Sequence, residues 1–246
     1  MKTYLIIICF IFPCCLINTV LAKDNVTIIK WQRNIRISYA SSSGNSESET
    51  FAGRFKLSFE GKTNRGYFNT EYYLDRDDDK ETENKLDIDG RWEHLIADRT
   101  FLFTNTHFKR DKMAGHEYRI YGGPGIGYDI IRTPTSHLKG LVSINYDYEK
   151  YTNNTGLTYS SAMGKFSTIY SIHILENLIF KEDIDYTISF ENSDRYFFDS
   201  ESAIQVKINN YLALELSYKI EYQNVTKAKN IEHTDRKLLA SLVVNF

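Results

Sequence analysis

Apolar and polar side chains alternate with a period of two residues along most of the chain from Asn34 to Phe246. The segment 212–222 shows the pattern clearly, because its even positions are all apolar or aromatic and its odd positions include Glu215 and Lys219. Successive side chains of a β-strand face opposite sides, so such a segment has one apolar wall and one charged wall. A helix would spread the same charges over all of its faces. The sequence therefore predicts an all-β fold.

The alternation predicts twelve strands, which span about 34–41, 50–60, 66–75, 84–95, 100–109, 116–131, 138–150, 157–173, 178–191, 196–208, 211–223 and 235–246. Strands of about ten residues suit a tilted crossing of a bilayer. Polar links such as 42–46, 76–80 and 152–155 follow odd-numbered strands, and shorter links such as 62–65, 97–99 and 209–210 follow even-numbered ones. This arrangement is typical of an antiparallel transmembrane β-barrel of about 12 strands with its N- and C-termini in the periplasm.

The first 22 residues have the features of a cleaved export signal, namely Lys2, an apolar run over 5–16 and permissive residues at Val20 and Ala22. A retained anchor would need about 20 apolar residues, and this run is shorter. We therefore expect a signal peptide at 1–22, a short N-terminal segment at 23–33 and an outer-membrane β-barrel at 34–246. All three cysteines lie within 1–22. Their absence from 23–246 excludes thiolate catalysis, Cys-ligated metals and disulfides in that part.

The last predicted strand favours a membrane barrel over a soluble one. Leu238, Ala240, Leu242, Val244 and Phe246 share one face, and an aromatic residue at the end of the final strand is similar to the signal read by the outer-membrane assembly machinery. A soluble lipocalin-like barrel is the alternative, with its apolar wall inside. However, twelve strands would then enclose a large dry cavity. The expected location is the cell outer membrane, with Phe246 as the assembly signal.

The composition limits the partners. The formal net charge of −2 gives no case for binding nucleic acid. The expected partners are outer-membrane lipids, lipopolysaccharide and the barrel-assembly machinery, and the oligomeric state stays open. No cofactor or metal site is expected.

Several motifs resemble the YdiY-like family of salt-induced outer membrane proteins, a domain of unknown function. The resemblance rests on the segments 43–46, 115–119, 123–128, 214–218 and 241–246, and it extends over about 34–246. It implies an outer-membrane barrel with a link to salt stress, and it brings no catalytic or ligand residues.

Two further patterns have mainly structural interpretations. Gly123, Gly125 and Gly127 share the polar face of one strand, where they are expected to relieve crowding or permit bending rather than to bind phosphate. Aromatic residues near strand ends predict girdles at the two bilayer interfaces. The predicted inner girdle comprises Trp92, Phe101, Phe180 and Tyr211, and the outer one Tyr39, Phe51, Tyr148, Tyr151, Tyr196 and Tyr222.

The polar wall contains the candidate functional residues. The predicted lumen-lining residues are Arg54, Lys56, Glu71, Asp87, Asp89, Arg91, Glu93, Glu215 and Lys219. Mixed charges fit a narrow channel for ions or small solutes with at most a weak charge preference. They fit equally a structural or salt-stress-related envelope protein whose lumen is occluded by ion pairs. An outer-membrane enzyme is a distant third hypothesis, because no Ser, His and acid combination is evident. We therefore expect no enzymatic activity.

Overall fold

The computed structural model describes residues 29–42, 48–77, 80–111, 116–151, 158–225 and 233–246. The expected signal peptide, most of the 23–33 segment and much of the links at 42–46, 76–80 and 152–155 lie outside these residues. The segment 43–46 and residue 115, on which the family resemblance rests in part, also lie outside them. Among the described residues, no helix has the length and apolar character needed to span a membrane.

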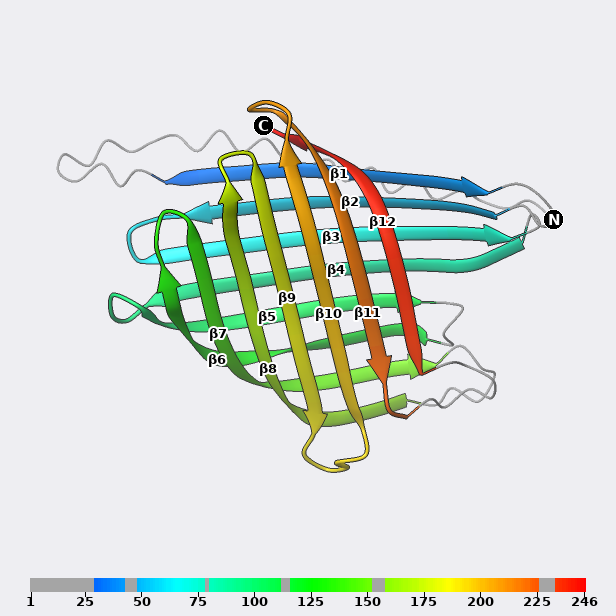
Figure 1. The fold of residues 1–246 in the computed structure, drawn as a ribbon. Coiled ribbons are helices and arrows are strands. Elements are labelled where there is room, and N and C mark those ends of the chain that lie inside the picture. The colour runs from blue at the N-terminus through cyan, green and yellow to red at the C-terminus, as the bar shows by residue number, and fades with distance from the viewer. Residues whose placement is uncertain (1–28, 43–47, 78–79, 112–115, 152–157, 226–232) are drawn as a thin grey trace, which may run out of the picture.

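The described chain forms twelve strands joined into one closed antiparallel barrel (Figure 1), which confirms the predicted fold. The strands are β1 (Lys30–Ser42), β2 (Ser48–Glu60), β3 (Asn64–Asp77), β4 (Lys80–Leu95), β5 (Thr100–Asp111), β6 (His116–Arg132), β7 (Ser136–Tyr151), β8 (Thr158–Leu175), β9 (Leu178–Ser189), β10 (Tyr196–Lys207), β11 (Leu212–Gln223) and β12 (Thr234–Asn245). Each strand pairs with its neighbours in sequence, and β1 pairs with β12 to close the ring.

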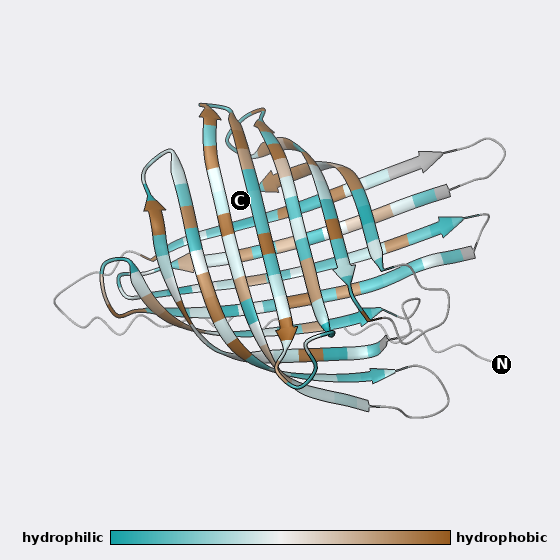
Figure 2. Cartoon of the chain, turned by 60° about the horizontal axis from the view of Figure 1, so that its bottom comes forward, coloured by the Kyte–Doolittle hydropathy of each residue, from teal (hydrophilic) through white to brown (hydrophobic). Residues whose placement is uncertain are grey.

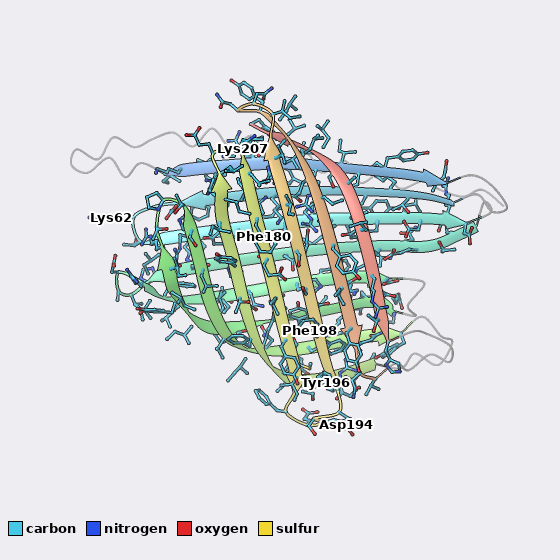
Figure 3. The ribbon with its side chains drawn as sticks, viewed as in Figure 1. Lys62, Phe180, Asp194, Tyr196, Phe198 and Lys207 are labelled. Carbon is cyan, nitrogen blue, oxygen red and sulfur yellow. The ribbon has the colours of Figure 1, made fainter. Side chains whose placement is uncertain are left out.

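The two ends of the barrel differ. The links after β2, β4, β6, β8 and β10 gather at one end, here named the turn end, where Lys62 and Lys207 lie (Figure 3). The links after odd-numbered strands lie at the opposite end, here named the loop end, and Asp194 marks the described β9–β10 loop there. Because the number of strands is even, β1 begins and β12 finishes at the turn end.

The two walls of the barrel have opposite chemistry, and hydropathy alternates along the strands (Figure 2). Outward-facing side chains such as Ile126, Val142, Leu214 and Leu216 are about half exposed although they are apolar. Most of the large apolar residues are therefore on the outside, where a bilayer rather than water would satisfy them. Charged side chains are instead buried on the inside.

The ladder between β1 and β12 is the shortest in the barrel. It comprises five residue pairs, from Asn34 opposite Asn245 to Ser38 opposite Ser241, whereas β1 forms thirteen pairs with β2. The hydroxyls of Ser38 and Ser241 are 2.6 Å apart at the last pair. Toward the loop end, Leu239 of β12 packs with Ala52 and Tyr73 on the inner face of β2 and β3. Side-chain packing therefore replaces strand pairing in this part of the seam.

The glycines of β6 allow close packing, as expected. A Cβ on Gly125 or Gly127 would overlap the ring of Phe103 or Phe101, and a Cβ on Gly123 would overlap the backbone of β7. Phe101 itself is completely buried with Phe103 and Leu141 inside the barrel. Its predicted place in the inner girdle is therefore wrong. The same correction applies to Tyr151, which is buried inside and donates a hydrogen bond to Glu149.

Candidate functional site

The lumen contains a cavity of about 750 Å³. All twelve strands contribute residues to its lining. The lining extends from Glu60, Arg132 and His137 near the turn end to Asp111 and Gln223 near the loop end. Because alternate residues of each strand point inward, the charged wall predicted from the sequence becomes the surface of this cavity.

Arg54 connects two separate parts of the lumen wall. Its Nε donates to Glu71 on the adjacent strand β3 at 2.6 Å. Its two terminal nitrogens both donate to the carboxylate of Glu201 on β10, each at 2.8 Å. Three strands, namely β1, β12 and β11, lie between β2 and β10 in the ring. Arg36 of β1 also donates to Glu201, at 2.8 Å, and forms an ion pair with Glu215. A charged network therefore crosses the interior rather than following one wall.

Glu221 of β11 is the centre of a second crossing. Lys85 of β4 donates to its carboxylate at 2.5 Å, and Lys109 of β5 lies 3.5 Å away. Lys219, on the same strand as Glu221, is 3.7 Å from it. Because β5 and β11 are separated by five strands on either side, the Lys109–Glu221 pair joins directly opposite sides of the ring. The lumen is therefore narrow here.

A third cluster bridges the wall near the turn end. Arg65 of β3 forms ion pairs with Glu93 at 2.6 Å and with Asp129 of β6 at 2.9 Å. Lys139 of β7 donates to the hydroxyl of Tyr67 on β3 at 2.8 Å. The carboxyl group of Glu93 is completely buried, and such a charge is tolerated only when it is paired.

A fourth cluster lies toward the loop end. Arg119 of β6 donates to Asp147 of β7 at 2.9 Å, and Arg195 lies 2.5 Å from Glu149. The guanidinium of Arg119 also stacks on the ring of Phe197 from β10, at 4.0 Å. These contacts reduce the free cross-section of the lumen at this level.

The nine residues proposed from the sequence lie on the inner wall. Seven of them line the cavity, and the structure places Glu93 and Glu215 in the buried ion-pair clusters instead. Lys56 lines the cavity, and no carboxylate in the described part of the chain forms an ion pair with it. On the adjacent strand β3, Arg54 lies directly opposite Glu71, and Lys56 lies opposite Asn69.

The sequence pattern did not single out several residues that hold the crossings together. These are Arg36, Arg65, Lys85, Lys109, Arg119, Asp129, Lys139, Arg195, Glu201 and Glu221. Those within the strands could have been predicted to face the lumen, because they occupy the polar face of the alternation. Their ion-pair partners could not have been predicted, because most of these partners belong to strands that are distant in the ring.

The chemistry of the site is that of a charged, partly filled lumen. Within the described ranges, no group of three or more His, Cys, Asp or Glu side chains is arranged to hold a metal ion. The aromatic rings of Tyr67, Tyr73 and Tyr121 lie beside lysine or arginine side chains of the lumen. The lysine and arginine side chains of the lumen thus contact both carboxylates and aromatic faces.

Solved structures similar to this barrel are outer-membrane proteins. The COG4313 outer membrane channel of Pseudomonas putida F1 aligns with a TM-score of 0.51 and 7% identity, covering 91% of this chain and 97% of that one. The translocator domain of the autotransporter NalP from Neisseria meningitidis aligns with a TM-score of 0.49 and 11% identity, covering 92% of this chain and 90% of that one. At such low identity the likeness concerns the fold alone.

The sequence comparisons identify the family. The uncharacterized protein YdiY of Escherichia coli strain K12 is 23% identical over 212 residues, which cover 86% of this chain and 82% of that protein. Residues 35–246 match the family described as "Protein of unknown function, DUF481". This match extends from β1 to the end of the chain, and the chain therefore belongs to the DUF481 family.

Proposed function

We propose that this protein is a narrow outer-membrane channel for ions and small polar solutes. The observation that carries the proposal is the polar cavity of about 750 Å³, whose lining extends from the turn end to the loop end. Lysine, arginine and carboxylate side chains along such a lining keep water in the passage. A solute would move along this wall without entering the apolar exterior of the barrel.

The size of the solute is limited by the crossings. Arg54–Glu201 and Lys109–Glu221 join wall segments that are not neighbours in the ring. A large or rigid solute would have to separate these buried charge pairs, which costs free energy. Inorganic ions and small flexible solutes can pass beside them. We therefore propose a low conductance.

The proposed location is the bacterial outer membrane, with the turn end in the periplasm. The apolar outer wall and the two unequal ends support this orientation. Export by a cleaved signal at 1–22 and assembly through Phe246 are part of the proposal. Surrounding lipid and lipopolysaccharide would be its main contacts, and catalysis is not part of it.

A second candidate function has a specific observation in its favour. Three lysines converge on Glu221, and two arginines converge on Glu201. If these pairs exclude water as well as solutes, the barrel is a closed envelope protein with a structural or salt-stress role. The two functions differ in one measurable property, namely flux through the lumen.

Flux into liposomes tests the proposal. Purified protein is inserted into liposomes, and swelling is followed in isotonic solutions of neutral solutes of increasing size. Entry of the smallest solutes and exclusion of the larger ones would support the channel. The variant Lys109→Met removes the widest crossing while Glu221 stays paired with Lys85 and Lys219. Faster swelling of this variant supports a lumen limited by that pair. No swelling in either protein would favour the closed envelope protein.

A further inference from the structure

Four carboxylates form a row across the lumen wall of β9, β10, β11 and β12. Asp185 lies directly opposite Asp199, which lies opposite Glu221, which in turn lies opposite Asp235. All four line the cavity. Directly opposed residues of adjacent strands have Cβ atoms about 5 Å apart, and like charges at this separation repel. The row is thus an unfavourable arrangement unless cations offset it.

The protein itself offsets only part of the row. Lys165 pairs with Asp185 at 2.9 Å, and Lys85, Lys109 and Lys219 pair with Glu221. For Asp199 and Asp235 no cationic side chain lies within ion-pair distance in the described residues. Both carboxylates therefore face the cavity without a direct ion-pair partner among the described residues.

The other charged residues of the lining do not offset the charge of Asp199 and Asp235. Asp183, one inward position along β9 from Asp185, lies opposite Glu201 and also lines the cavity without an ion-pair partner in the described ranges. Lys56 is the corresponding unpaired cation of the lining. Arg54, Arg119 and Lys139 have carboxylate partners. Three unpaired carboxylates thus stand against one unpaired lysine among these groups.

We propose that the wall formed by β9–β12 makes the lumen cation-selective, with Asp199 and Asp235 as the residues that attract the permeating cation. The preferred solutes are small inorganic cations and small organic cations with an ammonium group. The attraction is diffuse rather than chelating, since the described carboxylates do not form a metal-holding cluster. Acidic side chains along a pore wall raise the local concentration of cations and exclude anions. This inference rests on the proposed channel function and deepens it, and it differs from the expectation of at most a weak charge preference.

The absence of cysteine from 23–246 permits a direct measurement of this local potential. Ser167 lines the cavity on β8, directly opposite Asp185. In Ser167→Cys protein, made with a cysteine-free export signal, the rates of modification by a cationic and an anionic methanethiosulfonate reagent of similar size are compared. Thr63→Cys, in the β2–β3 turn, is the reference site outside the lumen. The cationic-to-anionic rate ratio should be about tenfold higher at position 167 than at position 63.

Neutral substitutions of the unpaired carboxylates then test whether Asp199 and Asp235 cause the higher rate ratio. Asp199→Asn with Asp235→Asn in the Ser167→Cys background should lower the ratio toward that of the reference site. Asp98→Asn, in the β4–β5 turn, makes a charge change outside the lumen and should leave it unaltered. Because Asp199→Asn and Asp235→Asn remove repulsion between carboxylates, this variant should fold at least as well as the protein without them. Heat-modifiable gel migration checks that it does.

The results separate this inference from the proposed function. An equal rate ratio at both sites, a ratio that is unchanged by the neutralised pair, or no reaction of the lumen cysteine with either reagent would overturn cation selection. The rate ratio does not require conduction, so a protein that blocks flux yet favours the cationic reagent would retain the cation-attracting wall and lose the channel. Flux with no preference for the cationic reagent would retain the channel and overturn the cation-attracting wall.

Discussion

The assignment of the two walls can be tested by adjacent lysine substitutions on β8. Phe166 lies near the middle of this strand, is 48% exposed and belongs to the apolar outer wall, opposite Val142 and Tyr186. Ser167, the next residue, faces the lumen cavity. The two positions are adjacent on one strand and face opposite walls of the barrel.

The wall that each residue faces sets the expected change in the free energy of unfolding. A lysine on the lipid face at the bilayer midplane destabilises an outer-membrane barrel by about 2–4 kcal/mol. Phe166→Lys should lower the free energy of unfolding by that amount. Ser167→Lys places its ammonium in a polar cavity beside Asp185 and should change the free energy of unfolding by no more than about 1 kcal/mol.

Denaturant unfolding of the liposome-inserted protein measures both effects. Trp31 and Trp92 are the two tryptophans of the chain, and both are about half exposed on the outer wall. Their fluorescence should therefore report the transfer from lipid to water. Equal losses in the two variants, or a larger loss at Ser167, would refute the assignment of the apolar wall to the lipid.

Three other substitutions test separate parts of the fold. Gly123→Ala should destabilise the barrel by about 1–3 kcal/mol, because the added Cβ overlaps the backbone of β7. Gly53→Ala is the control: its added Cβ has its nearest neighbour at 3.8 Å, and it should destabilise the barrel much less in the same unfolding assay. Phe246→Asp should reduce the amount of heat-modifiable barrel in the outer membrane while export continues; unaltered assembly would remove the terminal residue as a signal. Ser38→Cys with Ser241→Cys should form a disulfide visible on non-reducing gels, since these residues are directly paired, and failure to oxidise would contradict the closure of β1 onto β12.

The strands were predictable because the two-residue period follows from the backbone itself. The predicted bounds of β11, 211–223, differ from Leu212–Gln223 by one residue. The wall faced by Phe101 was predicted wrongly, because Phe101, Leu102 and Phe103 are all apolar and leave no alternation to follow. Tyr151 was misassigned for another reason. It shares the inward parity of Asp147 and Glu149, but its position at a strand end was given more weight.

The candidate site was less accessible from the sequence. Arg54 and Glu71 lie on consecutive strands, so a hairpin register places them together. Glu201, the other partner of Arg54, is four strands away in the ring. Such a contact depends on the shape of the closed barrel and on its β1–β12 seam, which local patterns do not determine. The row of carboxylates from Asp185 to Asp235 likewise requires the register of four strands at once.

Conduction through a single barrel is the decisive property of the proposed channel. The protein, produced from Lys23 onward, is inserted into a planar lipid bilayer and the current is recorded in potassium chloride. We expect small discrete steps, with a reversal potential in a salt gradient that favours potassium. The variant Lys56→Glu, which changes an unpaired lysine of the lining, should shift this potential further toward potassium. A bilayer that stays silent with correctly folded, heat-modifiable protein would contradict the channel and leave the closed envelope protein as the function of this barrel.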